Sequence, residues 1–234
     1  MNPLELQLTY LDLTTPHVAD AIMRLGIPVR QAPASVRPVW GDTHIVGRVR
    51  PARHYGSVDV FLEALEHAEP GDVLVVDNLG RDDEACVGDL ITLEVRHAGL
   101  CGIVIWGLHR DTSELRTIRL PVFSQGALPA GPQRLDAQEP DALTSARVGD
   151  HLVTGDDFVL ADDDGVLFLP LDRAPDIAEL ASTIRDTERH QAARMNLGDS
   201  FRNQARFSDY LAARDQDGTT FRQHLRSIGG AIEE

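Results

Sequence analysis

The sequence contains no lysine, and its 22 basic residues are all arginine. Schiff-base catalysis and pyridoxal enzymes both require a lysine amine, so these two classes are excluded. The Walker phosphate loop is also excluded, because its lysine must reach the bound phosphates. If the chain makes or breaks carbon–carbon bonds beside a carbonyl, a divalent metal with an arginine is the natural replacement for the missing amine.

Positive charge and long apolar runs are scarce as well. The formal net charge is -15, and nucleic-acid binding depends on basic patches, so we expect no nucleic-acid partner. The apolar stretches are too short for a membrane span, which takes about 20 apolar residues. The first residues, MNPLELQLTY, lack the basic-then-apolar plan of a signal peptide. We therefore expect a cytoplasmic protein with no membrane contact.

Metal-binding patterns of cysteine and histidine are missing too. Cys86 and Cys101 match neither CxxC spacing nor a disulfide framework. The nine histidines form no HxH or HExxH pair. His109 adjoins a candidate site and can touch substrate there, although an exposed loop histidine is the ordinary alternative. His54, with Arg53, precedes a helix in a second loop that can reach the same pocket.

Strand-like and helix-like segments alternate along the first 170 residues. Alternation of this kind favours a parallel sheet with right-handed crossovers. We expect helices at 16–25, from Ser57, from about 85 to 98 and at 112–118, with strands at 44–49, 73–76, 102–106 and 120–123. Short strands are expected at 148–153 and 158–161, and the Asp162-Asp163-Asp164-Gly165 turn predicts a hairpin into 166–170. A calcium loop is less compatible with this turn, because no glutamate follows at the required spacing.

The sequence predicts two parts. Residues 1–170 form the catalytic core, and residues 171–234 form a C-terminal helical extension that begins with a charged helix at 174–196. The remainder is more apolar than a disordered tail, because it contains Phe201, Phe207 and Tyr210. An amphipathic extension of this kind packs either across a neighbouring subunit or on its own core.

The most informative motif pairs Gly88-Asp89-Leu90-Ile91 with Arg110-Asp111 and Glu114, which follow the next buried strand. Open α/β sheets bind ligands at the carboxyl ends of their strands. A guanidinium beside a carboxylate suits an oxo-acid substrate held by Arg110 and a hard metal ion on Asp111. The first-turn N–H groups after Gly88 can bind a substrate carboxylate, and Asp89 can manage a proton.

A capping function explains the same residues without any ligand. Asp111 can cap a helix, Glu114 can be its capping-box partner, and Arg110 can be merely exposed. Asp89 likewise can simply complement the positive end of a helix dipole. Both interpretations remain open at the level of sequence.

These motifs, together with Gly71-Asp72-Val73-Leu74-Val75-Val76-Asp77 and Leu120-Pro121-Val122-Phe123, resemble the RraA-like family over about residues 16–170. The family includes the 4-hydroxy-4-methyl-2-oxoglutarate/4-carboxy-4-hydroxy-2-oxoadipate aldolases and protein regulators of ribonuclease E. The resemblance implies a single α/β domain of the swivelling α/β/β/α kind. It also implies a homotrimer or a dimer of trimers with active sites between subunits.

In the aldolase branch, the resemblance assigns roles to single positions. Arg110 contacts the pyruvyl carbonyl, Asp111 binds Mg²⁺ or Mn²⁺, and Glu114 lies near the water shell of the metal. The turn from Gly88 to Ile91 binds the pyruvate carboxylate through its backbone, and Asp89 positions a catalytic water. Two features depart from relatives: Asp77-Asn78-Leu79-Gly80 replaces a more glycine-rich loop, and the C-terminal extension exceeds the minimal domain.

The sequence therefore predicts a metal-dependent lyase. We expect it to cleave a 4-hydroxy-2-oxo acid to pyruvate and a second carbonyl product, with oxaloacetate decarboxylation as a side activity. The alternative is a non-catalytic regulator that binds a ribonuclease or another protein.

Overall fold

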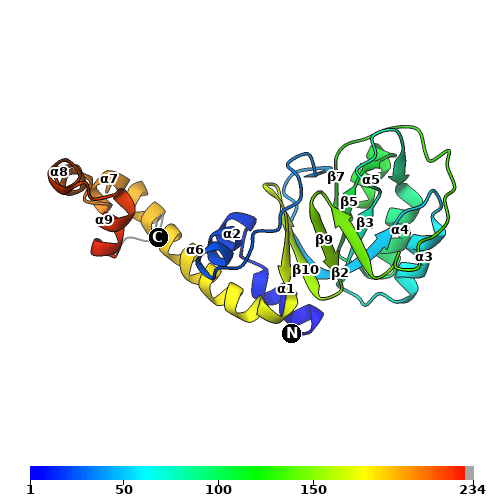
Figure 1. Cartoon of the computed structure of the whole chain (residues 1–234), viewed down its shortest axis with the longest axis horizontal. Helices are drawn as coiled ribbons and strands as arrows, with labels where there is room; N and C mark the ends of the chain where they lie inside the picture. The colour runs from blue at the N-terminus through cyan, green and yellow to red at the C-terminus, as the bar shows by residue number, and fades with distance from the viewer. Residues whose placement is uncertain (230–234) are drawn as a thin grey trace.

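A computed structural model describes residues 1–229 and contains one mixed α/β domain (Figure 1). Its main sheet has seven strands in the order β1-β7-β5-β3-β2-β10-β11. The central strands β2, β3, β5 and β7 are parallel, whereas β1, β10 and β11 are antiparallel to their neighbours. Their bounds are Arg37–Pro38 (β1), Ile45–Arg53 (β2), Val73–Asp77 (β3), Gly102–Trp106 (β5), Val122–Ser124 (β7), Asp157–Asp162 (β10) and Gly165–Pro170 (β11).

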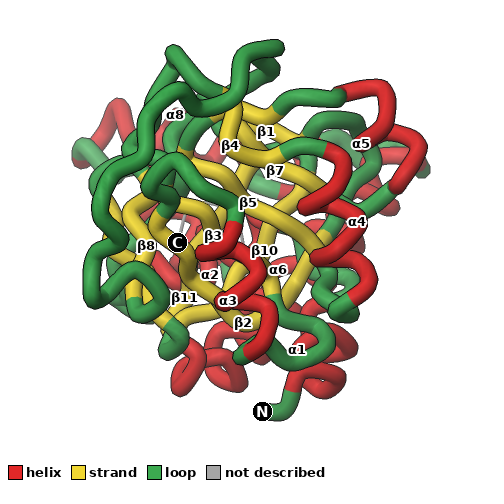
Figure 2. Tube along the Cα trace, turned by 90° about the vertical axis from the view of Figure 1, so that its right-hand side faces the viewer, coloured by secondary structure: helices red, strands yellow, loops and turns green. Residues whose placement is uncertain are grey.

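The two innermost strands are apolar because both of their faces are covered. All five residues of β3 are buried, and Val73 pairs with Val49 on one side and Gly102 on the other. On one face pack α3 (Asp59–Glu66), α4 (Asp89–His97) and α5 (Thr112–Ile118), and on the other lies the hairpin of β8 (Ser145–Val148) and β9 (His151–Thr154). Figure 2 shows α4 and α5 on one side of the strands and β8 on the other.

Three helices cover the antiparallel end of the sheet. They are α1 (Pro3–Tyr10), α2 (Thr15–Arg24) and α6 (Ala174–Asn196), and they share a core with β10 and β11. The helix α6 then runs away from the sheet to α7 (Phe201–Gln204), α8 (Phe207–Asp217) and α9 (Phe221–Ile228) (Figure 1). Among the described residues, no helix has the length and apolar character needed to cross a membrane.

The expected single α/β domain is confirmed, and three local expectations are corrected. The segment 85–98 begins with a short strand, β4 (Ala85–Val87), before α4 starts at Asp89. The segment 148–153 contains the turn of the β8–β9 hairpin, because Gly149 has a φ of 59°. The helix α1 was not expected; it starts at an Asn2–Glu5 capping box. As expected, Asp162-Asp163-Asp164 forms the β10–β11 turn, in which Asp162 accepts hydrogen bonds from Thr15.

Candidate functional site

A short parallel strand pair brings the two halves of the predicted motif together. The strand β4 pairs with β6 (Leu108–His109) beyond the carboxyl edge of the main sheet. The Arg110 N–H donates a 2.9 Å hydrogen bond to the Val87 carbonyl. Because Gly88 follows β4 and Arg110 follows β6, residues 22 positions apart lie side by side.

A glycine is required at position 88 because there is no room for a side chain, and not because the backbone conformation needs one. Its φ of -132° and ψ of -161° are extended values that any residue adopts. A Cβ at Gly88 would lie 2.3 Å from Asp111 Oδ2 and 3.2 Å from the Arg110 side chain. The missing side chain therefore lets the arginine–aspartate pair pack directly against the start of α4.

Asp111 occupies the N-cap position of α5, but its side chain makes no capping hydrogen bond. Its backbone is left-handed, with a φ of 60°, which turns the carboxylate toward α4. Asp111 Oδ2 lies 3.3 Å from Arg110 Nε and accepts a 3.3 Å hydrogen bond from the Asp89 N–H. The side-chain capping explanation for Asp111 is therefore wrong.

Asp89 begins α4 and satisfies part of its own helix. Its Oδ1 accepts a 2.8 Å hydrogen bond from the Leu90 N–H, one of the first-turn donors that a helix leaves without a backbone partner. Ile91 is buried, whereas Leu90 is 73% exposed. A carboxylate already sits where the sequence predicts that a substrate carboxylate binds.

Gly88, Asp89, Arg110 and Asp111 are hereafter called the open cluster. The first three line a cavity of about 180 Å³, and Asp111 adjoins it through its contact with Arg110. Val58, Leu90 and Pro132 form part of its wall. One water molecule takes about 30 Å³ of liquid volume, so the cavity has the size of a small oxo acid. Arg110 and Asp111 keep 48% and 33% of their side-chain surfaces exposed, which leaves both accessible to a ligand.

The open cluster suits a cation that needs few protein ligands. Mg²⁺ commonly binds through one or two carboxylates and retains several waters, and the Asp111 carboxylate does not cap its own helix, α5. Glu114 lies exposed in the first turn of α5 and makes no hydrogen bond or ion pair with Arg110 or Asp111 within residues 1–229. The described residues contain no group of three or more metal-ligating side chains, so a cation at this site would have at most one or two protein carboxylates.

His109 lies buried next to the open cluster and does not face solvent. It is 4% exposed, its Nδ1 lies 2.6 Å from Ser124 Oγ, and its Nε2 lies 3.0 Å from Thr112 Oγ1. Burial lowers the pKa of His109, which favours the neutral ring. The expectation of an exposed loop histidine is wrong: this ring ties β6 to β7 and to the start of α5.

A second polar cluster lies at the carboxyl ends of β2 and β3 and is mostly buried. It comprises His54, Asn78, Glu84 and Arg134, hereafter the closed cluster. Its His54 and Arg134 line a separate cavity of about 380 Å³, so His54 does not reach the cavity of the open cluster. His54 Nδ1 lies 2.9 Å from Asn78 Oδ1, which also accepts a 3.1 Å hydrogen bond from Arg134 Nη2. Glu84 receives Arg134 Nη2 at 2.9 Å and Arg134 Nε at 3.2 Å. Burial lowers the pKa of His54.

Arg134 belongs to residues 125–144, a segment without regular secondary structure that we call the strap. It crosses both clusters. The Ala85 N–H donates a 2.8 Å bond to the Ala130 carbonyl, and a Cβ at Gly131 would lie 3.1 Å from Arg110 Nη1. The hydrogen bonds of Arg134 in the closed cluster thus hold the strap in place, and the strap passes beside the Arg110 side chain.

The sequence predicts the open cluster but not the closed one. It indicates His54 and Asn78 as parts of loops beside the pocket, whereas no local pattern points to Glu84 or Arg134. One signal was present: a structureless loop longer than about 15 residues inside a compact domain is usually functional. The contacts themselves join positions 24 to 56 residues apart, which no local pattern reveals.

Comparison with known proteins gives a consistent family relationship. The model of the RraA-like family, described as Aldolase/RraA, matches residues 15–168. Protein DlpA of Legionella pneumophila is 25% identical over 188 residues, which cover 76% of this chain and 29% of that protein. The chain therefore spans less than a third of the length of this relative.

Solved structures share the fold. An uncharacterized protein from Pseudomonas syringae superposes with a TM-score of 0.73 at 22% identity, covering 84% of this chain and 94% of that one. An unusual member of the RNase ES inhibitor RraA family from Streptomyces coelicolor gives 0.67 at 25% identity and covers 82% and 98%. The RNA-processing inhibitor RraA from Thermus thermophilis gives 0.57 at 28% identity and covers 65% and 92%.

Proposed function

The chain belongs to the RraA-like (Aldolase/RraA) family, and from this premise we propose that it is a divalent-metal-dependent lyase acting on 2-oxo acids in the cytoplasm. The reaction is the cleavage of a 4-hydroxy-2-oxo acid to pyruvate and a second carbonyl compound. Oxaloacetate decarboxylation is expected as a side activity, because it passes through the same enolate of pyruvate.

The observation that supports this proposal most strongly is the condition of Asp111. Its carboxylate does not cap its own helix, α5; it accepts a hydrogen bond from the Asp89 N–H at the start of α4 and lies 3.3 Å from the guanidinium of Arg110, which lines a small cavity. An aspartate with a purely capping role would bond to the first turn of α5. Instead, a negative oxygen and a half-exposed guanidinium are held where a ligand can reach both.

In this mechanism the chain binds and orients the substrate through α4 and Arg110. The N–H groups of Leu90 and Ile91 hold the substrate carboxylate at the positive end of the helix. Arg110 donates to the 2-oxo oxygen, where negative charge grows during cleavage. Mg²⁺ or Mn²⁺, held by Asp111 with Glu114 acting through water, would supply additional positive charge beside that oxygen.

Asp89 handles the proton. The substrate carboxylate takes the Leu90 N–H that Asp89 Oδ1 now occupies, and this exchange releases the Asp89 carboxylate toward a water. Through that water Asp89 accepts the proton of the 4-hydroxyl group. The C3–C4 bond breaks, C4 becomes the carbonyl of the second product, and the electron pair moves to the enolate. Protonation at C3 then yields pyruvate.

An apolar rim beside the cavity supports an assembly with neighbouring subunits. Val58 and Leu90 line the cavity and are 48% and 73% exposed, and Leu62 and Leu93 on the same two helices are 45% and 37% exposed. Exposed apolar surface next to a ligand pocket marks an interaction site. We infer a homotrimer or a dimer of trimers in which a second subunit covers this rim.

The proposal is tested by a lactate dehydrogenase-coupled assay for pyruvate. A panel of 4-hydroxy-2-oxo acids and oxaloacetate is assayed with Mg²⁺, with Mn²⁺ and with EDTA. We expect metal-stimulated pyruvate release that Arg110→Lys weakens, because a point charge does not reproduce the planar guanidinium. Arg116→Lys, on the exposed side of α5, is the matched control. Undiminished turnover in EDTA would reject the metal mechanism.

A regulatory function is the second candidate, because two of the similar solved structures are named as RNA-processing or RNase inhibitors. It predicts no pyruvate release from any substrate of the panel. It also predicts that the protein inhibits a ribonuclease in a purified cleavage assay. The two assays together separate the candidates.

A further inference from the structure

The C-terminal part of the chain differs in charge from the rest. Residues 1–184 carry 14 arginines and 29 acidic residues, whereas residues 185–228, hereafter the arm, carry eight arginines and six acidic residues. The arm is therefore slightly cationic on a strongly anionic protein. Within residues 1–229, Arg189, Arg202, Arg222 and Arg226 make no ion pair.

The arm packs little on the rest of its own chain, to which an ion pair between His17 and Glu188 joins it. The buried residues of α6 end at Ile184, and the helix continues for 12 further residues to Asn196. Figure 1 shows α7, α8 and α9 at its far end, away from the sheet. Helix segments of about 12 residues are marginal in water without packing, and units near 40 residues usually need an additional source of stability.

Apolar side chains on the arm face solvent. Met195 and Leu197, at the end of α6, are 48% and 88% exposed. The aromatic residues Phe207, Tyr210 and Phe221 pack on one another with ring centroids 4.9–5.8 Å apart, but each remains partly exposed. Contact with a partner would bury this surface together with the unpaired arginines.

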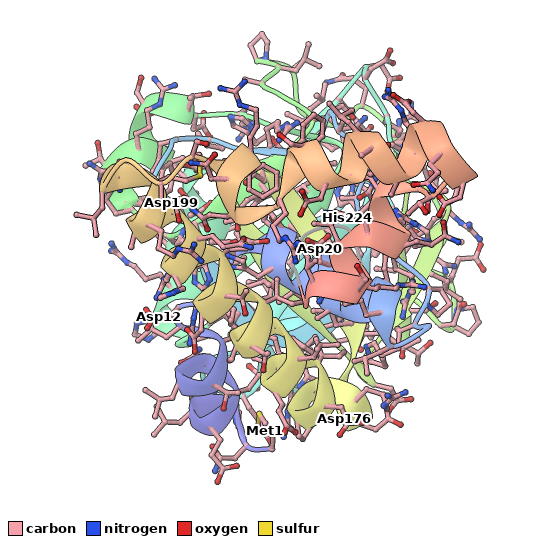
Figure 3. The ribbon with its side chains drawn as sticks, turned by 90° about the vertical axis from the view of Figure 1, so that its left-hand side faces the viewer. Met1, Asp12, Asp20, Asp176, Asp199 and His224 are labelled. Carbon is pink, nitrogen blue, oxygen red and sulfur yellow. The ribbon has the colours of Figure 1, made fainter. Side chains whose placement is uncertain are left out.

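The helix α1 has a complementary face. Leu4, Leu8 and Leu11 lie at i, i+4 and i+7, on the side opposite the buried Leu6 and Tyr10. They are 63%, 62% and 64% exposed. Residues 1–13 carry two acidic side chains, Glu5 and Asp12, and no arginine. In Figure 3, the labels Met1 and Asp12 lie on either side of α1 in the sequence, and the labels Asp199 and His224 mark the arm.

We propose that the arm of one copy packs on the leucine face of α1 of a second copy, and that a two-fold axis repeats the contact. Each chain carries both halves of the contact: an exposed apolar surface flanked by arginines and an exposed leucine stripe flanked by acids. A two-fold exchange satisfies both halves at once, and in a dimer of trimers it joins a chain of one trimer to a chain of the other. Opposite charge across the contact also makes it sensitive to salt.

This contact can be mapped with a single introduced thiol. Cys86 is buried, and burial raises the pKa of the Cys101 thiol to about 12, so neither competes for a thiol reagent. Leu197→Cys is labelled with a thiol-reactive benzophenone, mixed with unlabelled ¹⁵N protein and irradiated. Because the chain lacks lysine, trypsin releases residues 1–24 as one peptide. The wild-type chain is the control for unwanted labelling.

We expect cross-links that join a ¹⁴N arm peptide to the ¹⁵N peptide 1–24, and light scattering that gives a mass above that of one chain. Leu8→Asp should reduce the cross-link yield at least tenfold, whereas Leu152→Asp, at a half-exposed position in β9, should leave it unchanged. Cross-links confined to one copy, cross-links to another peptide of the second copy, or a monomer would each overturn the proposal. These outcomes are independent of lyase activity.

Discussion

The open and closed clusters use the same chemistry for different ends. Each pairs an arginine with a carboxylate at the carboxyl edge of the strands. In the closed cluster Glu84 is 4% exposed and meets Arg134 through several hydrogen bonds. In the open cluster Asp111 has one ion pair and one backbone donor, and a third of its side chain is exposed. The difference indicates that the closed pair holds the strap, whereas the open pair is available to a ligand.

The largest expected effect comes from opening the closed cluster. Glu84→Ala leaves the Arg134 guanidinium without its main partner, and breaking a buried pair on one side costs about 3–5 kcal/mol. Thermal unfolding should shift down by roughly 10 °C. The double variant Glu84→Met/Arg134→Met should recover part of this loss. Equal stability of Glu84→Ala and wild type would remove the distinction between the clusters.

The next largest effect is expected at the open cluster, where a substitution should lower the activity but not the stability. Gly88→Ala places a methyl group 2.3 Å from the Asp111 Oδ2 position and displaces the carboxylate. A misplacement of about 1 Å costs on the order of 10²-fold in rate, so kcat/KM for pyruvate release should fall by about that factor. Gly155→Ala is the control for adding a methyl group at a glycine, because Gly155 has no positive φ and its nearest neighbour would lie 4.0 Å from the new Cβ. Full activity of Gly88→Ala would contradict the assigned geometry.

The two buried histidines give a pH dependence shared by both clusters. Burial lowers the pKa of His54 and of His109, so below the ordinary value near 6.5 the unfolded chain binds more protons than the folded one. Their contribution to stability is present above about pH 6.5 and is lost as pH falls toward the folded pKa. Urea unfolding should therefore show a smaller pH dependence between pH 7.5 and 5.5 in His109→Gln than in wild type. An unchanged dependence would contradict burial of a neutral ring.

Glu114→Gln is expected to have the smallest effect. The side chain is exposed and does not contact Asp111, so it can act only through the water shell of the metal. The Mg²⁺ concentration for half-maximal activity should rise by less than about tenfold, with thermal stability unchanged. A loss as large as that of Gly88→Ala would mean that Glu114 binds the metal directly.

Sequence was sufficient for the elements whose signal is local. The apolar runs of β3 and β5 and the Asp-Asp-Asp-Gly turn each predict their structure from neighbouring residues. The open cluster was also predictable, because strand ends place Arg110 and Asp111 at one edge. The conformation of Asp111 could not be predicted from the sequence, because its left-handed backbone and its contact with Asp89 depend on the pairing of β4 with β6. The closed cluster depends on the course of the strap, which no periodicity describes.

The most direct test of the central claim compares pyruvate release from oxaloacetate by wild type and Asp111→Asn, each with saturating Mg²⁺ and with EDTA. The substitution keeps the size of the side chain and removes its charge, and circular dichroism confirms the fold. We predict metal-stimulated release by wild type and a rate at least about 10²-fold lower for Asp111→Asn, with no response to Mg²⁺. A variant that retains the wild-type rate and its response to Mg²⁺ would contradict the assignment of the open cluster as the reacting centre.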